Sequence, residues 1–371
     1  MLNPRPILPL VFILWGCTLS TQETTQRAEQ PEAMPQTTFQ KGVNLSHYLS
    51  QTGRREYAEP GFIVEEDLAW IAARGYDHIR LPVDGPLLIN KKGQVRKERL
   101  PALDQTINWA HRQGLGVLLD VHKLPGSTFS GDIDSRLFTD PKLQEQAIGL
   151  WRILAERYKH IGPELRFEIL NEPVADNDQV VTAFYAKVLA SIREFSGDRV
   201  VYLCPNRWGR IESAAALKPL LDDPNVMIDV HYYEPHIFTH QKASWVGSDI
   251  PGIPDIPFPG TIPDLRAWLP GHHYGHDLGG TRLTKASIEK DLRHLKEWAL
   301  RNDVEVYIGE FGVYEEAPAA DRENWYRAVM DAISEEGFGW AVWDYKGGFA
   351  VRNARSGQPT LVQSVLDDYL D

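Results

Sequence analysis

Two glutamates in the sequence stand where they could act as a catalytic pair. Glu172 lies in the run Leu170-Asn171-Glu172-Pro173 and Glu310 lies in Gly309-Glu310-Phe311-Gly312, each directly after an apolar stretch. Cleavage of a glycosidic bond needs two carboxyl groups, one protonated and one ionised. A single glutamate in such a place is more often a strand-end carboxylate bonded to a loop N–H or to an arginine. Two of them, each after an apolar stretch, favour chemistry.

Further polar and aromatic residues follow other apolar stretches of the chain. Those that we expect to line a binding site are Arg80, His122, Asn171, Asn206, Trp208, His231, Tyr233 and Trp343. Most have a structural alternative: a loop-capping asparagine, a buried histidine bonded to a backbone carbonyl, or an aromatic ring in the core. Because such residues recur at almost every apolar stretch, a common site is the better interpretation.

The residue types suggest how the two glutamates could differ in protonation. Arg80 is a charged residue inside an apolar stretch and needs a partner, which Glu310 could supply. We expect Arg80 and a hydrogen bond from Tyr233 to hold Glu310 ionised. The pKa of Glu172, on the less charged side, should be the one that is raised.

The elements that position these residues are predicted by the hydrophobic pattern. Short β-type runs alternate with segments of helical period such as 65–74, 103–113, 143–158, 180–195, 288–301 and 325–335. The predicted strands are 42–45, 78–83, 116–122, 165–170, 200–205, 226–233, 306–312 and 338–345. Eight such repeats predict a single (β/α)8 TIM barrel, in which active sites lie at the carboxyl ends of the strands. An open nucleotide-binding sheet lacks support, since no Gly-x-Gly-x-x-Gly turn follows the first strand.

One long insertion interrupts the alternation. Residues 234–284 follow the sixth predicted strand, and their middle is crowded with proline and glycine. A segment in this position overhangs the active-site face of a barrel. We therefore expect it to shape the substrate site as a lid.

The N-terminal residues predict export. An apolar run at 7–16 has the length of a signal-peptide core and is too short to span a bilayer. It ends in Leu14-Trp15-Gly16-Cys17, which resembles the lipobox of bacterial lipoproteins, so residues 1–17 are predicted as a signal segment with lipidation at Cys17. Residues 18–38 read as a flexible tether and 39–371 as the catalytic domain. The predicted location is at a bacterial membrane, either in the periplasm or on the cell surface. Ordinary secretion without an anchor is the alternative.

Charge and composition limit the partners. The chain has 371 residues and a net charge of −12, without a basic stretch, which argues against nucleic acid as a partner. The run His272-His273-Tyr274-Gly275-His276 lacks the ligand spacing of a metal site. We expect no cofactor, no metal, a monomer and a buried, unpaired Cys204.

At these motifs the sequence resembles glycoside hydrolase family 5, the cellulase family. Asn171-Glu172-Pro173 is similar to the acid/base motif of the family and Gly309-Glu310-Phe311-Gly312 to its nucleophile motif. The resemblance implies catalytic glutamates on strands four and seven. It also implies that Asn171 binds the sugar 2-hydroxyl, that Trp343 forms a sugar platform and that no metal is needed.

A closer likeness concerns the substrate. Residues 238–245, 309–312 and 341–346 resemble compact bacterial endoglucanases of the endoglucanase C type, and His122-Lys123-Leu124-Pro125-Gly126 is also reminiscent of β-1,3-glucanases. The resemblance implies a retaining, endo-acting β-glucanase on β-1,4-glucan or mixed-linkage β-1,3-1,4-glucan. Ser46-His47-Tyr48 replaces a common family motif, so β-1,3-glucan and β-mannan remain alternatives. Two other classes also remain: a lipoprotein that binds glycans without cutting them, and a sugar-phosphate enzyme, which the export signal disfavours.

Overall fold

The protein is described from a computed structural model, which covers residues 39–52, 61–130, 133–269 and 278–370. Eight parallel strands close into a barrel in the order β1-β10-β9-β6-β5-β4-β3-β2. This confirms the predicted (β/α)8 architecture. The barrel strands are β1 (Lys41–Asn44), β2 (His78–Asp84), β3 (Gly116–Lys123), β4 (Leu165–Glu168), β5 (Val201–Leu203), β6 (Val226–Tyr232), β9 (Val306–Phe311) and β10 (Gly339–Val342).

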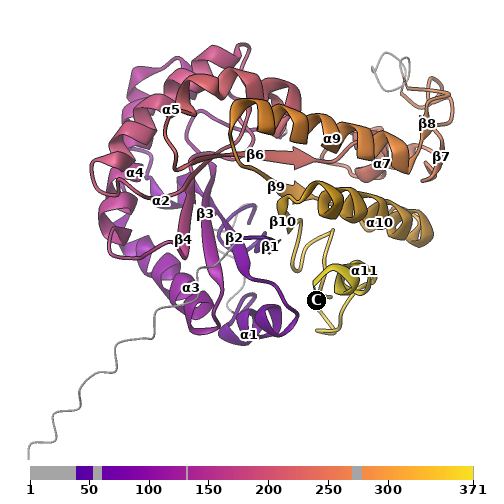
Figure 1. The fold of residues 1–371 in the computed structure, drawn as a ribbon, viewed down its shortest axis with the longest axis horizontal. Helices are drawn as coiled ribbons and strands as arrows, with labels where there is room; N and C mark the ends of the chain where they lie inside the picture. Colours follow the sequence, from indigo (N-terminus) through magenta and orange to yellow (C-terminus); the bar gives the residue numbers. More distant parts are fainter. Residues whose placement is uncertain (1–38, 53–60, 131–132, 270–277, 371) are drawn as a thin grey trace, which may run out of the picture. The chain divides into compact units, whose positions relative to one another are not determined.

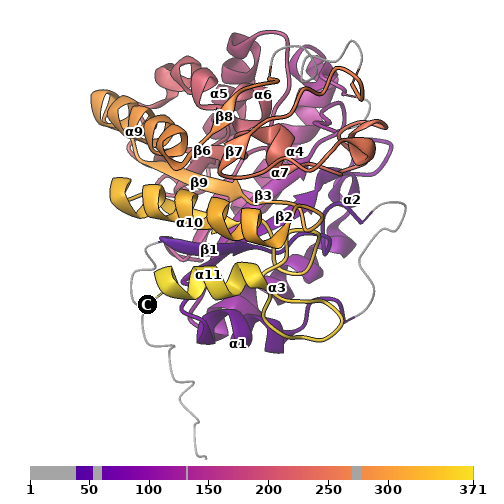
Figure 2. The same cartoon turned by 90° about the vertical axis from the view of Figure 1, so that its right-hand side faces the viewer.

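Helices surround the barrel and follow the strands in sequence (Figure 1). In Figure 2, α9, α10 and α11 lie one below the other along one side of the barrel. The longer helices are α1 (Glu65–Ala73), α3 (Leu100–Arg112), α4 (Pro141–Tyr158), α5 (Asp178–Arg193), α9 (Lys285–Asn302), α10 (Ala319–Glu336) and α11 (Leu361–Leu370). Shorter helical turns are α2 (Gly85–Leu88), η1 (Lys97–Arg99), η2 (Arg136–Phe138), α6 (Asn206–Gly209), η3 (Ile211–Leu220), α7 (His236–Thr239) and η4 (Ile250–Gly252).

Local sequence signals explain where these elements begin and end. In α4, the Asp140 side chain accepts a hydrogen bond from the Lys142 backbone N–H, and Pro141 occupies the first helical position. Gly337 ends α10 in the left-handed conformation that glycine adopts without strain. The barrel strands are buried on both faces, because helices cover one face and the barrel core the other, and their apolar runs are interrupted by the buried polar side chains of the site.

Several strands are shorter than the sequence predicts. The fourth ends at Glu168 rather than residue 170, and the eighth is confined to Gly339–Val342. Asn171 and Glu172 therefore stand beyond the end of β4, on the turn that leaves the barrel, and Glu172 has a positive φ of 39°. This backbone conformation is rare for residues other than glycine, and the residues that adopt it concentrate at functional sites.

The pairing between β6 and β9 contains a register irregularity. The register between these strands shifts between Val230 and His231, and His231 is then paired with Glu310. A bulge beside an active site re-aims a side chain. Here it places an imidazole next to a carboxylate.

The insertion after β6 buries apolar residues that are continuous with the hydrophobic core of the barrel. Within its described part, β7 (Gly260–Thr261) pairs antiparallel with β8 (Arg282–Leu283). The apolar side chains that it buries include Ile237, Phe238, Ile250, Ile253, Ile256, Phe258, Ile262, Leu265, Leu269 and Leu283. Residues 270–277, including the histidine run, and the signal, Cys17 and tether segments lie outside the described residues.

No helix among the described residues combines the length and the apolar character needed to cross a bilayer.

Candidate active site

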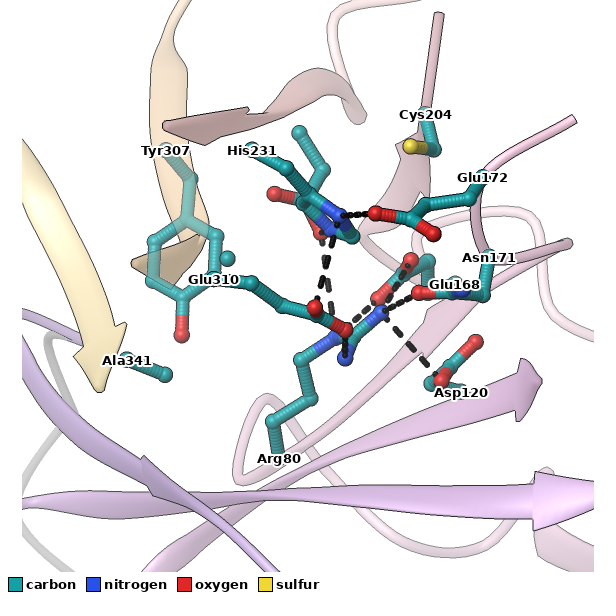
Figure 3. Close-up of polar contacts among 12 residues, drawn as sticks. Arg80, Asp120, Glu168, Asn171, Glu172, Cys204, His231, Tyr307, Glu310 and Ala341 are labelled. Carbon is teal, nitrogen blue, oxygen red and sulfur yellow. Dashed lines mark hydrogen bonds and ion pairs between the residues drawn. The ribbon is translucent and has the colours of Figure 1, made fainter. Parts of the chain in front are cut away.

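The Arg80 guanidinium lies at the centre of the candidate site, at the inner wall of the barrel (Figure 3). Its Nε and Nη2 donate to the two oxygens of Glu168 at 2.7 and 2.8 Å. Nη2 also donates to Asn171 Oδ1 at 2.7 Å, and Nη1 donates to Asn44 Oδ1 at 2.9 Å and to Glu310 Oε1 at 2.7 Å. All five N–H groups are therefore used, which fixes the guanidinium in one orientation.

Glu310 is held at both carboxylate oxygens. Arg80 bonds Oε1, and the Tyr233 hydroxyl donates to Oε2 at 2.9 Å. The contacts expected from the sequence are thus present. They leave Glu310 one orientation, with a cation on one oxygen and a phenol on the other.

Glu172 is held by a different group. A hydrogen bond of 2.8 Å joins its Oε1 to Nδ1 of His231, and the same nitrogen lies 3.6 Å from Glu310 Oε2. His231 therefore stands between the two glutamates, as Figure 3 shows. An oxygen of each carboxylate and one ring nitrogen of His231 all lie within 4.8 Å of one another.

Burial raises the pKa of both glutamates, which differs from the expectation for Glu310. Desolvation is the largest cause in each case and brings the pKa of Glu172 to about 8 and that of Glu310 to about 7. His231, Arg80 and Tyr233 all act to lower the pKa of Glu310. The direction of the difference is as predicted: Glu172 keeps its proton to the higher pH. Desolvation lowers the pKa of His231 to about 4, so this imidazole is neutral at pH 7.

A second histidine and an aromatic ring form one wall of the site. His122 and Trp343 stack in parallel, with ring centroids 5.6 Å apart and planes inclined by 4°. Nδ1 of His122 bonds to Asp120 Oδ2 at 2.7 Å. Within the described residues, His122 Nε2 and Asn171 Nδ2 are buried and have no hydrogen-bond partner. A polar ligand would give these two nitrogens the partners that buried polar groups need.

The structure gives Asn206 a different role from the predicted substrate contact. Its Nδ2 donates to the Ala175 carbonyl at 2.9 Å and to Asp178 Oδ1 at 2.7 Å, and its Oδ1 accepts from the Ala175 N–H at 2.8 Å. Both amide hydrogens and the oxygen are used within the protein. We therefore assign Asn206 to anchoring the loop that follows Glu172.

Trp208 is 41 % exposed, and its position is fixed by hydrogen bonds to the protein. Its indole N–H donates to the Phe129 carbonyl at 2.8 Å, and its backbone N–H donates to the Pro173 carbonyl at 3.4 Å. An exposed ring held in one position next to the Glu172 loop suits the apolar face of a sugar.

Three carboxyl groups beneath the candidate pair are not among the site residues expected from the sequence. Asp120, Glu168 and Asp229 are fully buried and lie close to Arg80, at 3.2, 2.7 and 3.9 Å. The signal was the two-residue period of a strand: Asp120 precedes His122 by two residues, as Asp229 precedes His231. A charged residue two positions before a predicted site residue faces the same interior.

Two groups of described side chains could hold a metal ion, and both draw on the same centre. One is Glu172, His231 and Glu310; the other is Glu168, Cys204 and His231. Cys204 is buried and unpaired as predicted, and burial raises the pKa of its thiol. The two groups share His231, whose Nδ1 already forms a hydrogen bond with Glu172.

Comparison with known proteins agrees with this geometry. Endoglucanase C from Acetivibrio thermocellus is 31 % identical over 315 residues, covering 83 % of this chain and 91 % of the relative. Cellodextrinase A from Ruminococcus flavefaciens is 28 % identical over 80 % of this chain and 82 % of its own. The structure of a hyperthermophilic endo-β-1,4-glucanase in complex with substrate matches with a TM-score of 0.72 and 26 % identity, over 89 % of this chain and 97 % of the other.

The model of the cellulase family, glycosyl hydrolase family 5, matches residues 37–348. This match spans all eight barrel strands and every residue of the candidate site. The chain therefore belongs to the cellulase family, glycosyl hydrolase family 5, and is a glycoside hydrolase similar to the endo-β-1,4-glucanases.

Proposed function

We propose that the protein is a retaining, endo-acting β-glucanase that cleaves β-1,4-glucan or mixed-linkage β-1,3-1,4-glucan. The observation that carries the retaining mechanism is the spacing of the pair, because an oxygen of Glu172 lies within 4.8 Å of an oxygen of Glu310. Retaining glycosidases hold their carboxyl groups about 5–5.5 Å apart, and inverting ones about 6.5–9.5 Å apart to admit a water.

The contacts of the two glutamates assign their roles in this mechanism. Glu310, fixed by Arg80 and Tyr233, attacks the anomeric carbon while Glu172 gives its proton to the leaving oxygen. The bond from carbon to the leaving oxygen breaks as the ester to Glu310 forms. Glu172, now ionised, takes a proton from water, and this water displaces Glu310 with overall retention.

Three further residues would bind and orient the sugar. The unpartnered Nδ2 of Asn171 would donate to the 2-hydroxyl, a contact that strengthens in the transition state. His122 Nε2 would contact a neighbouring hydroxyl, and the Trp343 ring would lie against the sugar. The glucan substrate is supported by the endoglucanase and cellodextrinase names of the relatives.

The test measures release of new reducing ends by the full chain. Barley mixed-linkage glucan, carboxymethyl-cellulose, laminarin and mannan serve as substrates, with Glu310→Gln as the inactive variant. We expect release from the first two and a loss of at least about 10³-fold in the variant. A relative called a probable glucan 1,3-β-glucosidase, 28 % identical over half of this chain, makes laminarin the informative alternative. Binding of oligosaccharides without release from any polymer would contradict the proposal and favour a glycan-binding protein.

The stereochemistry needs its own measurement. NMR of the first product formed from a soluble cellooligosaccharide should show the β-anomer, and a 2-fluoro-glycoside should label Glu310. An α-anomer as first product would overturn the retaining mechanism.

We also propose that the protein is exported and anchored to a bacterial membrane by a lipid on Cys17. Support comes from the apolar run at 7–16 and the lipobox-like Leu14-Trp15-Gly16-Cys17, followed by a polar tether. Such a tether would let the catalytic domain reach glucan outside the cytoplasm.

A further inference from the structure

The centre of the barrel holds more carboxyl groups than its arginine can neutralise. Asp120, Glu168, Asp229 and Glu310 all lie within 4.0 Å of the Arg80 guanidinium, and each is buried. Carboxylates that share one buried cation cannot all be ionised, because each added charge repels the others in a medium that solvates none of them. Some of these groups must keep a proton.

Asp229 differs from the others in its contacts. Its Oδ2 lies 3.9 Å from Arg80 Nε and 4.0 Å from His231 Nε2, too far for a hydrogen bond to either. Neither of its oxygens has a hydrogen-bond donor among the described residues, although both are fully buried. An ionised carboxylate in such a place would carry an uncompensated charge.

The neighbour that shares Arg80 with Asp229 is another carboxyl. Arg80 Nε lies 3.9 Å from Asp229 Oδ2 and 2.7 Å from Glu168 Oε2, and both oxygens of Glu168 already accept from Arg80. Two carboxyl groups bond to each other only when one of them carries a proton. Arg80 Nε and Nη2 both donate to Glu168, which favours the ionised form of Glu168. Asp229 is therefore the member of the pair that carries the proton.

We propose that Asp229 is a positioning residue that stays protonated during catalysis and donates its hydrogen bond to Glu168. Glu168 is then the ionised partner of the Nε–Nη2 edge of Arg80, and Nη1 remains aimed at Glu310. Asp229 thus acts on the nucleophile through Glu168 and Arg80, without touching the substrate. The proposal rests on the role proposed above for Glu310.

The groups around Asp229 favour its neutral form. Burial, which is the largest cause, and the charge of Glu168 both raise the pKa of Asp229 well above its ordinary value, whereas Arg80 acts to lower it. The titratable and charged groups that face Asp229 are Arg80 on β2, Glu168 on β4, Tyr202 and Cys204 on or next to β5, His231 on its own strand, Tyr307 and Glu310 on β9, and Tyr185 on α5. Arg80 is the only cation of that set, and it is already saturated with acceptors.

A glycine at position 309 leaves room for the Asp229 carboxyl. A Cβ atom at position 309 would overlap the Asp229 side chain, so only glycine fits on the strand residue before Glu310. Asp229 therefore packs directly against the backbone that carries Glu310. A change in the size or the protonation of the Asp229 side chain would therefore alter the position of Glu310.

The first experiment compares the same chemical change at two neighbouring positions of the full chain. Asp229→Asn keeps a neutral side chain that can donate to Glu168, whereas Glu168→Gln removes the charge that holds Arg80. We expect Asp229→Asn to keep kcat and kcat/KM within about threefold of the wild type, with both limbs of the pH profile unmoved. Glu168→Gln should lower kcat by at least about 30-fold, with a smaller change in KM.

Two outcomes would overturn the proposal. If Asp229→Asn loses as much activity as Glu168→Gln, the ionised form of Asp229 is needed. If Asp229→Ala is as active as the wild type, no positioning role exists. Circular dichroism and thermal melting confirm that each variant is folded, and Glu310→Gln in the same assay separates failure of the nucleophile assignment from failure of this proposal.

Infrared spectroscopy tests the proton without using activity. At about pH 9, above the pKa values of about 7 and about 8 of Asp120, Glu310 and Glu172, those three groups are largely ionised. We expect the wild type to retain a C=O stretching band of a protonated carboxyl, and Asp229→Asn to lack it. Identical spectra of the two proteins in the C=O stretching region would contradict a protonated Asp229.

Discussion

At the scale of single residues, the two glutamates differ in what holds them. Glu310 is bonded to a cation and a phenol, whereas Glu172 is bonded to a neutral imidazole. Both are buried, so the pKa of each lies above the ordinary carboxyl range. The contacts of Glu310 oppose this rise more strongly, which makes it the first of the pair to ionise.

This difference predicts a bell-shaped pH profile. Activity requires Glu310 ionised and Glu172 protonated, so kcat/KM rises as the first proton leaves the pair, near pH 7, and falls as the second leaves, near pH 8. Tyr233→Phe removes a hydrogen bond that lowers the pKa of Glu310, so the acidic limb should move to higher pH and kcat should fall about tenfold. Initial rates measured across the pH range check both statements. An unmoved acidic limb in the variant would show that the phenol does not tune Glu310.

At the scale of elements, one buried carboxylate joins the first helix to the segment after the last strand. Asp67, in the first turn of α1, accepts hydrogen bonds from Tyr345 at 2.9 Å, Lys346 at 2.8 Å and Arg352 at 2.7 Å. It also accepts from the Val64 backbone N–H at 3.0 Å, next to its own helix. This contact closes the barrel from outside, where β10 leads into the loop carrying the site tryptophan.

Replacing Asp67 should therefore lower stability far more than activity. Asp67→Asn leaves Lys346 and Arg352, which are mostly buried, without their counter-charge, and we expect the free energy of unfolding to fall by about 3 kcal/mol. Urea unfolding at pH 7 measures the change. The matched control is Asp264→Asn, in an exposed pair with Arg266, where the change should stay below about 1 kcal/mol. Equal effects in the two variants would refute the closing role of Asp67.

At the scale of the whole molecule, the active site lowers the stability of the fold at high pH. The folded protein holds the Glu172 proton up to a pKa of about 8, and the ordinary value is 4.5. Between these values the folded state binds more protons than the unfolded one. The contribution of Glu172 is thus most favourable below about pH 4.5 and is lost as the pH rises through about 8.

Glu172→Gln should accordingly stabilise the protein, and only on the alkaline side. We expect its Tm at pH 9 to exceed that of the wild type by several degrees, and the difference to vanish near pH 4. Differential scanning calorimetry at both pH values measures it. Glu316→Gln, at an exposed position, is the control and should change Tm at neither pH. A gain of equal size at both pH values would mean that the proton is not its cause.

The proposed anchor is also a property of the whole chain. Cys17→Ser removes the thiol to be lipidated, and we expect the protein to move from the membrane fraction to the soluble exported fraction of a bacterial host. Labelling with a radioactive fatty acid should be lost together with membrane association. Membrane association that survives the substitution would contradict a lipid anchor on Cys17.

The amino-acid sequence alone predicts the architecture, because eight buried parallel strands that alternate with helices leave a regular apolar pattern along the chain. It also identified Glu172, Glu310, Arg80, His231 and Tyr233 as neighbours, since strand ends of a barrel meet on one face. The cellulase family followed from motifs of only a few residues.

The three-dimensional structure was needed to establish how those residues share charge and contacts. It placed Asp120, Glu168 and Asp229 under the pair, raised the pKa of Glu310 and assigned Asn206 to a loop. These outcomes depend on burial and on distances between residues far apart in the chain. A pattern of residue types carries the period of each strand but not the register that sets one strand against the next, and at β6 and β9 that register is irregular.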